Sequence, residues 1–563
     1  MKKALVLFSI ILLVISLAGC SQDSGGSNST DPTLYTLSVD KEGKGNFVSP
    51  SGTGDFKYEE DSIADISLEP FSGNKFSYWE GKDSTEIVET DKNNKWKLNM
   101  DENKAIKAVF NREDIYILDL EDGNGTLTLD NFQNNEYALV TVFPMDDSGT
   151  NHIIDEMSVT NKESTANKLS SMTNNINSQS VSEINSTGNI IRTSSKYREI
   201  EKEMLKKHSK LKKTAMVKAK NYSTQSDLSV GSQESFKVKD NGTTKDVNAT
   251  LKAKGDSALI WVDNSVNDIT ESDATAFLGE FESNIYTTVK NYFGREPTAE
   301  EFPILTKHGE KINILFTPLS NIGGYFWSGD LFSKDSIENS NERKIFFINS
   351  SSAMEYQFGT LAHEFQHMLY YNELVLSDTP QNINDIWINE GFSTLAEDLT
   401  GYGYKSEENT MVNLVDDYVA APNEISLINW NSNNDIHYAS SYLFARYIFD
   451  RFGKEIIKYN NESPAGPKED IAEFTDLSFK RIFGDWAITL TGISNKEIYN
   501  YSSISVPSIY GYSFEPGDYI TNVQVKGWGI LAGFVSNGTS EDINIDFDSD
   551  LSNVWMKVKR GDL

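Results

Sequence analysis

The sequence predicts a multidomain α+β protein in which β-rich modules flank a central region of mixed helices and strands. Its 563 residues are too many for one ordinary hydrophobic core. Short stretches of alternating polar and apolar residues dominate the first third of the chain and the tail, whereas apolar stripes at helical spacing appear between them. Charged residues at 24% and aromatic residues at 11% are typical of a folded protein.

The N-terminus predicts an export signal. Lys2 precedes an apolar run over residues 4–18 that is short for a membrane span and suited to a signal-peptide core. The run ends in Leu-Ala-Gly-Cys, which resembles the lipobox of bacterial lipoproteins and implies lipidation at Cys20. Residues 1–20 would then be the lipoprotein signal peptide, and 21–33 a flexible tether to the cell membrane or surface. A plain secreted protein is the alternative. Because Cys20 is the only cysteine, no disulfide is expected.

A β-rich N-terminal half is predicted after the tether. Residues 34–112 alternate and break at glycines, and they carry Val-Ser-Pro-Ser-Gly from Val48, a Trp-Glu-Gly turn at Trp79, and a closing Ala-Val-Phe. These marks resemble the InlB-type bacterial β-repeat, a surface spacer or adhesive unit. Residues 113–160 predict further strands. Residues 161–225 predict a Ser/Asn/Thr-rich linker and a basic helix, with a propeptide role left open.

The formal charge of -32 excludes the basic footprint of a nucleic-acid-binding protein. Such a surface mainly keeps a protein soluble, and structural Ca²⁺ is left open as a second role. The oligomeric state is not legible from the sequence.

A mixed domain is expected over 226–505. Several strands lead into a helix from about Ser272 to Phe293, with Gly294 as its stop, and then into the helix that carries His363. A sheet covered by helices is the expected arrangement. The stretch from Asn321 to Phe332 fits an edge strand for an extended peptide, or equally a core strand. Residues 506–563 predict a small C-terminal β-domain.

The sequence His363-Glu364-Phe365-Gln366-His367 is an HExxH motif. Residues four apart on a helix share one face, so His363 and His367 can bind one metal ion. Glu364 lies beside them, where it can take a proton from an attacking water.

A catalytic zinc needs a third protein ligand. Glu373 stands six residues after His367, a spacing that resembles the third-ligand position of the metzincin group, but that resemblance implies a glycine where this chain has Tyr370. Glu373 is therefore expected to face solvent. Glu390 begins the second turn of a helix predicted from about Asp385 to Thr400, and is the preferred third ligand.

A family resemblance supports Glu390. Trp387-x-Asn-Glu-Gly-Phe, with Glu397 further on, looks like the corresponding segment of aminopeptidase N and its relatives. Together with "HEFQHML" and "FKRIFGDWAI", it more closely resembles the hyicolysin family of bacterial zinc metallopeptidases, over residues 226 to 500. The resemblance implies a thermolysin-like gluzincin domain with Zn²⁺ on His363, His367 and Glu390, acting on protein or peptide substrates. The Gly-x-Met-Glu-Asn strand of the aminopeptidases is missing, so an extracellular endopeptidase is expected.

Peptide hydrolysis also needs a donor for the carbonyl oxygen that becomes charged. In the aminopeptidase relatives a tyrosine opens the matching helix, which implies Tyr438, whereas thermolysin-like enzymes use histidine, which implies His437. Glu364 is expected to act as general base and then as proton donor to the leaving amine. Glu397 is a candidate to orient an imidazole, although the aspartate that does so in thermolysin corresponds to Thr394 here.

Two other functions are compatible with the sequence. The chain could be a non-enzymatic adhesin or binding lipoprotein on a degenerate peptidase core, with its function in the β-rich half. The presence of Glu364 argues against this alternative, because a peptidase core that had lost its activity would not need a glutamate to activate water. Another zinc hydrolase reaction, such as epoxide hydrolysis, is the third possibility.

Overall fold

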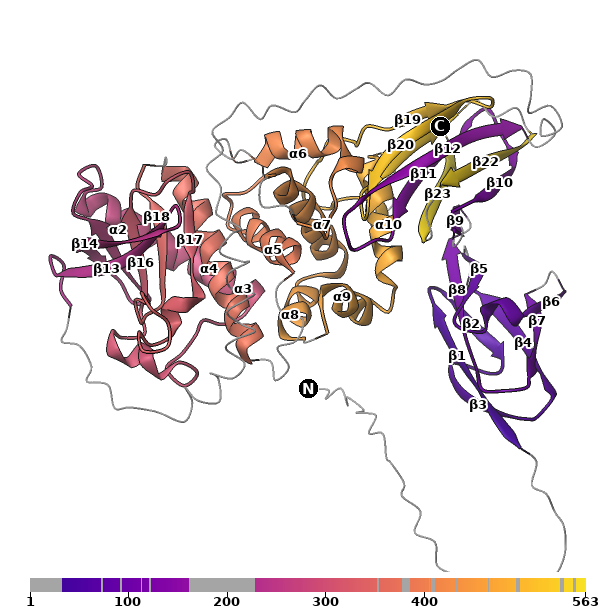
Figure 1. The fold of residues 1–563 in the computed structure, drawn as a ribbon, viewed down its shortest axis with the longest axis horizontal. Helices are drawn as coiled ribbons and strands as arrows, with labels where there is room; N and C mark the ends of the chain where they lie inside the picture. Colours follow the sequence, from indigo (N-terminus) through magenta and orange to yellow (C-terminus); the bar gives the residue numbers. More distant parts are fainter. Residues whose placement is uncertain are drawn as a thin grey trace, which may run out of the picture. The chain divides into compact units, whose positions relative to one another are not determined.

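The computed structural model describes residues 33–71, 74–91, 94–112, 114–120, 123–161, 228–351, 354–376, 385–404, 406, 411–430, 434–463, 465–492, 497–536, 541–549 and 553–562. Apart from boundary residues, the predicted signal peptide with Cys20, the tether and the linker lie outside these ranges. The chain divides into two compact units, which are described in turn (Figure 1). Among the described residues, no helix combines the length and the apolar character needed to span a bilayer.

Residues 34–112 form two four-stranded sheets of order β3-β1-β8-β5 and β2-β4-β7-β6. The strands are β1 (Leu34–Glu42), β2 (Gly45–Ser49), β3 (Gly54–Glu59), β4 (Ser62–Pro70), β5 (Asn74–Glu80), β6 (Val88–Asp91), β7 (Lys95–Met100) and β8 (Lys104–Arg112), with a short 3-10 helix η1 (Ser84–Glu86). Trp79, from the predicted turn, packs with ring centroids 5.2 Å from Trp96 and 5.9 Å from Phe47. Gly81 has φ of 108°, a conformation that favours glycine.

Two segments of the second unit, residues 115–161 and 512–562, form one β-sandwich. Its sheets have the orders β10-β22-β12-β20 and β19-β21-β11-β23-β9. The strands are β9 (Ile115–Leu120), β10 (Gly125–Phe132), β11 (Glu136–Pro144), β12 (Asn151–Asn161), β19 (Tyr512–Phe514), β20 (Tyr519–Lys526), β21 (Leu531–Val535), β22 (Glu541–Ser549) and β23 (Val554–Asp562).

This sandwich corrects the predicted separate C-terminal β-domain. β11 pairs with β21 on one side and β23 on the other, and β12 lies between β20 and β22. The strands of 113–160 and 506–563 therefore share two sheets and one apolar core. Neither segment could bury its inner faces alone, since a sheet is hydrophobic on the side that it packs.

The central part of the unit holds a six-stranded sheet of order β13-β14-β15-β16-β18-β17. Its strands are β13 (Gln233–Asp240), β14 (Thr243–Lys254), β15 (Ala258–Asp263), β16 (Ile312–Thr317), β17 (Gly324–Phe326) and β18 (Ile345–Asn349). β15, β16 and β18 are parallel, and β17 runs antiparallel to β18 at the edge. The runs "ALIWVD", "INILFT" and "IFFIN" are buried at every position, as expected for strands covered on both faces.

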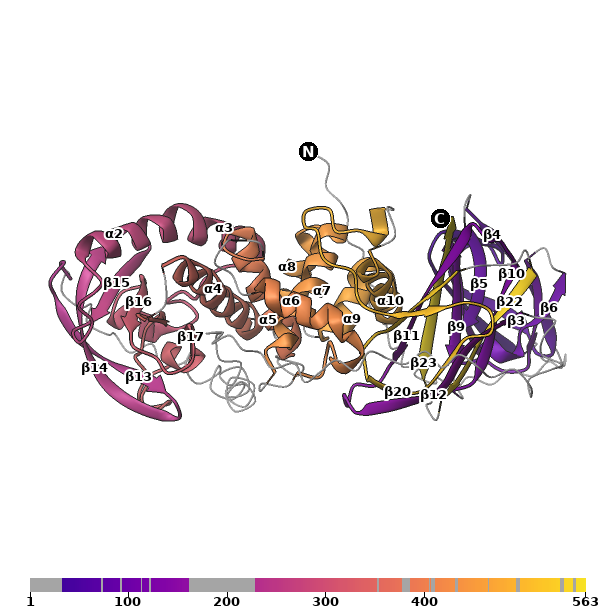
Figure 2. The same cartoon turned by 90° about the horizontal axis from the view of Figure 1, so that it is seen from above.

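Helices cover one face of this sheet and continue into a helical region (Figures 1 and 2). The helices are α2 (Glu271–Glu280), α3 (Tyr286–Phe293), α4 (Met354–Leu376), α5 (Ile386–Leu399), α6 (Met411–Ala420), α7 (Ile436–Phe452), α8 (Glu455–Glu462), α9 (Pro467–Thr475) and α10 (Phe479–Leu490). Short 3-10 turns are η4 (Pro303–Lys307), η5 (Ser328–Leu331), η6 (Pro422–Glu424) and η7 (Glu497–Tyr499).

The helix expected from Ser272 to Phe293 differs in two details. It begins earlier, because Thr270 and Asp273 form a capping box in which each side chain accepts the other's backbone N–H. A π-helical segment, η3 (Phe281–Ile285), interrupts it, and Asn284 from this segment donates to the Thr400 carbonyl at the end of α5. The helix ends at Gly294 as predicted.

A buried cluster of ion pairs connects the sandwich to the helical region. Asp485 on α10 accepts hydrogen bonds from Lys557 on β23 and, at 2.7 Å, from Arg451 on α7. Phe143 on β11 packs 4.7 Å from Phe483, between ring centroids. Buried charges are tolerated when paired in this way, so the sandwich and the helices form a continuous interior.

Candidate metal centre

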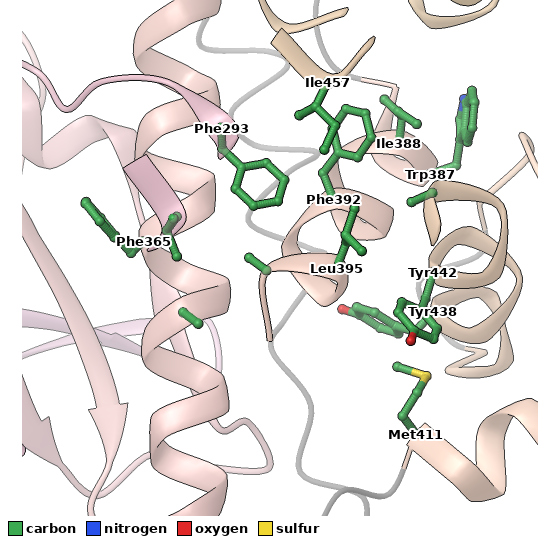
Figure 3. Close-up of a cluster of buried hydrophobic side chains, with 14 of the residues drawn as sticks. Phe293, Phe365, Trp387, Ile388, Phe392, Leu395, Met411, Tyr438, Tyr442 and Ile457 are labelled. Carbon is green, nitrogen blue, oxygen red and sulfur yellow. The ribbon is translucent and has the colours of Figure 1, made fainter. Parts of the chain in front are cut away.

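The HExxH motif lies in the middle of α4, with both histidines and the glutamate fully buried. α4 packs on β17 and β18 through one face and on α5 through another. In Figure 3, Phe365 points from α4 away from α5, and Phe392 and Leu395 project from α5 among the surrounding helices. Phe365 packs 5.5 Å from the rings of both Phe281 and Tyr286. This apolar anchoring fixes the rotation of α4 and directs its histidines toward α5.

Glu390 on α5 meets both histidines. Its Oε2 lies 3.1 Å from Nε2 of His363 and 3.5 Å from Nε2 of His367. Zinc bonds of about 2.0–2.2 Å in a tetrahedral arrangement put ligand atoms roughly 3.4 Å apart, so these separations fit a shared ion. One potential ligand atom each from His363, Glu364 and His367 also lies within 4.8 Å of the other two, which places Glu364 beside the same point.

The second nitrogen of each imidazole is held by a side chain of α5. Nδ1 of His363 lies 2.8 Å from Glu397 Oε1, and Nδ1 of His367 lies 2.9 Å from Asn389 Oδ1. Because both partners are oxygen acceptors, each Nδ1 carries the proton and each Nε2 is left to face Glu390. Orientation of metal-ligating histidines by such partners is a general property of metal sites.

The charge of the cluster favours a cation. Three carboxylates, from Glu364, Glu390 and Glu397, are buried around the two imidazoles. Burial opposes protonation of His363, but the hydrogen bonds that its ring donates to the Glu390 and Glu397 carboxylates outweigh burial and raise the pKa of His363 to about 9. Glu390 Oε1 is buried without a hydrogen-bond partner in the described part of the chain. Buried carboxylates are normally paired or bind metals, so the residues present fit a Zn²⁺ ion.

Glu364 is held from the edge strand. The backbone N–H of Phe326, the last residue of β17, donates to Glu364 Oε2 at 2.6 Å. The carboxylate that could act as a base is thereby fixed against the sheet edge next to the histidines.

The other candidates are placed as follows. Glu373, expected to face solvent, is half-buried and accepts the backbone N–H of Arg295 at 2.8 Å, which corrects that expectation. Thr394 donates to the Glu390 carbonyl of its own helix. Glu397, and not Thr394, is the side chain of α5 that lies against Nδ1 of His363. Asn389 received no role from the sequence, although its place directly before Glu390 on a buried helix face was a usable signal.

Tyr438 and His437 lie in the first turn of α7, and both are buried. The Tyr438 ring centroid is 6.3 Å from that of His363, so Tyr438 lies beside the cluster. His437 Nδ1 is 3.1 Å from the Ser426 carbonyl, which can only accept, so Nδ1 carries the proton. Burial lowers the pKa of His437 to about 4, and its Nε2 at neutral pH is an acceptor. Tyr438 remains as the candidate donor.

Over 242 residues the sequence is 30% identical to the neutral metalloprotease ShpI of Staphylococcus hyicus. The chain is a distant homologue of a neutral metalloprotease. The match covers 39% of this chain and 52% of the relative, so the chain spans about half the length of the curated metalloprotease that it matches. No family model matches the sequence.

Proposed function

We propose that this chain is a zinc-dependent endopeptidase of the gluzincin type, with His363, His367 and Glu390 as metal ligands. The observation that carries the proposal is the position of the Glu390 carboxylate against the Nε2 atoms of both histidines, at 3.1 and 3.5 Å. The similarity to a neutral metalloprotease supports the same reaction class. Glu364, retained and held by a backbone N–H, argues against a degenerate peptidase core.

The residues divide the chemistry as follows. Zinc, when bound, would polarise the scissile carbonyl and make the attacking water more acidic. Glu364 accepts the proton of that water and passes it to the leaving amine, while the Phe326 N–H keeps one carboxylate oxygen in place. Tyr438 donates its O–H to the oxygen that becomes negatively charged. An extended peptide added along the edge strand β17 would bring its carbonyl to these groups.

The proposal is tested by zinc content and casein hydrolysis of three variants. Wild type is expected to bind one zinc ion and to cleave unfolded substrates. Glu364→Gln should retain zinc but lose about 10²- to 10⁴-fold in kcat, the usual contribution of a general base. Glu390→Ala should lose zinc. Glu373→Ala is the control, because Glu373 is also a glutamate but accepts the backbone N–H of Arg295. This variant should retain both zinc and activity.

Three results would contradict the proposal. A wild type without zinc, or a Glu364→Gln variant with full activity, excludes this mechanism. Zinc retained by Glu390→Ala but lost by Glu373→Ala would mean that the third ligand is misassigned.

We further propose that the protein is exported and anchored by a lipid at Cys20, with the N-terminal β-repeat as a spacer at the cell surface. Cys20→Ser should move the protein from the membrane fraction to the medium, without changing its activity on casein. Equal membrane association of both forms would exclude the anchor.

A further inference from the structure

The segment from Ile425 to Trp430, directly upstream of α7, packs on the residues beside the metal centre. The Trp430 ring lies 4.9 Å from the Tyr438 ring, between centroids, with the planes at 85°. It also lies 5.5 Å from the His437 ring at 35°. Trp430 is half-buried, and its ring packs against the ring of Tyr438. Edge-to-face contacts of this kind are a preferred aromatic geometry.

The same segment is tied to the first turn of α7 by a hydrogen bond. His437 donates from Nδ1 to the Ser426 carbonyl at 3.1 Å. Because His437 and Tyr438 are adjacent, this bond and the Trp430 contact attach the start of α7 to the segment at two points.

The β-sandwich holds this segment in place. Asn429 donates from Nδ2 to the Ser148 carbonyl at 2.7 Å, in the turn between β11 and β12. Leu427 N–H donates to the Trp528 carbonyl at 3.1 Å, in the turn between β20 and β21. Gly149 has φ of 66°, and a Cβ there would lie 2.4 Å from the Asn429 side chain, so the turn is shaped to fit Asn429. Two turns of the sandwich thus accept hydrogen bonds from the segment that carries Trp430 and hold it in place.

We propose that Trp430 is a positioning residue for Tyr438, and that the β-sandwich, through Asn429, keeps Trp430 in position. The sandwich is then part of the catalytic unit. This inference rests on the proposed peptidase function for its kinetic consequence, but the placement of the Tyr438 ring can be measured without activity. The physical reason is that a displacement of about 1 Å in a catalytic group can cost roughly 10²-fold in rate.

The first test is ¹⁹F NMR of full-length protein with 3-fluorotyrosine incorporated at position 438, with and without zinc. Wild type should give one sharp resonance. Trp430→Ala and Asn429→Ala should shift or broaden it, and Trp430→Phe should restore most of the wild-type signal. Asn423→Ala is the matched control. Asn423 also donates to the sandwich, to the Gln524 carbonyl at 2.9 Å, but it lies before the Ile425–Trp430 segment. A resonance unchanged in both Trp430→Ala and Asn429→Ala overturns the proposal.

The second test is a double-mutant cycle with Tyr438→Phe. Trp430→Ala should lower kcat about tenfold in the wild-type background, with KM and zinc content within about twofold, since it acts on the reacting geometry. In the Tyr438→Phe background the same change should lower kcat no further. An equal loss in both backgrounds would mean that Trp430 acts independently of Tyr438 and overturns the proposal. A wild type without peptidase activity contradicts the proposed function instead, and the ¹⁹F spectra then decide the positioning role.

Discussion

Glu397 Oε1 lies 2.8 Å from Nδ1 of His363, although 34 positions separate the two residues in the sequence. The contact joins two buried helices, and one turn further along α4 Asn389 holds His367 in the same way. α5 therefore supplies the third candidate ligand together with the two groups that orient the other ligands. Any change in the packing of α5 on α4 would therefore move Glu390, Glu397 and Asn389 relative to the two histidines.

Removal of either orienting group should weaken metal binding. Glu397→Gln and Asn389→Ala are each expected to lower zinc affinity about 10- to 100-fold, because an imidazole that is free to turn loses orientation and basicity. Competition with a chromogenic chelator measures the affinity. Thr394→Val is the control, since Thr394 donates to a carbonyl of its own helix, and the zinc affinity of this variant should equal that of wild type. A larger loss in Thr394→Val than in Glu397→Gln would refute this assignment.

Tyr438→Phe should lower kcat about 10²- to 10³-fold with zinc content and KM nearly unchanged, because the lost O–H acts on charge that develops in the transition state. Steady-state kinetics on a fluorogenic peptide measures the effect. Tyr442→Phe, one turn further along α7, removes a hydroxyl of the same kind and should retain most of the activity. The prediction fails if the two variants lose the same amount.

Asp330 should make stability depend on pH. Burial raises the pKa of Asp330 to about 7, against hydrogen bonds from Asn341 and the charges of Lys239 and Arg343, which lower it. A pKa raised in the folded state means a contribution that is fully present below the unfolded pKa of 3.8 and is lost as the pH rises through about 7.

Asp330→Asn should therefore match wild type near pH 4 and be more stable above pH 7. The difference should reach a few kcal/mol, because one pKa unit corresponds to about 1.4 kcal/mol. The introduced amide oxygen can still accept from Asn341. Urea unfolding of metal-loaded protein between pH 4 and 8 measures the difference, and a gap that stays constant over this range would contradict the prediction.

The sandwich should unfold together with the helical region. Lys557→Met leaves Asp485 buried with one partner fewer and is expected to cost about 3–5 kcal/mol, as is typical for breaking a buried ion pair. Lys237→Ala, which removes a more exposed pair with Asp246, should cost at most about 1 kcal/mol. Urea denaturation followed by circular dichroism compares the two.

A chain that stops at residue 505 tests the same relationship. It removes both neighbours of β11 and exposes the sandwich core, so it should not give a soluble, cooperatively unfolding protein. A stable truncated protein would show that 506–563 is an independent domain after all.

Local patterns predicted much of this molecule. The strands of the central sheet and of the sandwich, the helix that ends at Gly294, and the helix that carries Glu390 all follow from periodicity, caps and breakers, which act within a few residues. The nearness of His363 to His367 likewise follows from one helical turn.

The pairing of distant segments could not be predicted in this way. Strands from 113–160 and 506–563 alternate in the same sheets, and no local pattern in either segment specifies which strand it pairs with. The π-helical segment at Phe281–Ile285 and the contact of Glu373 with Arg295 also depend on packing against neighbouring elements.

The sequence by itself determined the candidate site residues: two histidines and a glutamate in one helix, and Glu390 in a second helix further along the chain. Only the tertiary structure decided how they are used. It turned Glu390 toward both Nε2 atoms, assigned Glu397 and Asn389 to the Nδ1 atoms, made His437 a donor to the Ser426 carbonyl, and brought Trp430 against Tyr438. The physical reason is that a helical turn is set by neighbours in the chain, whereas the rotation of one buried helix against another is set by the shape of everything packed around it.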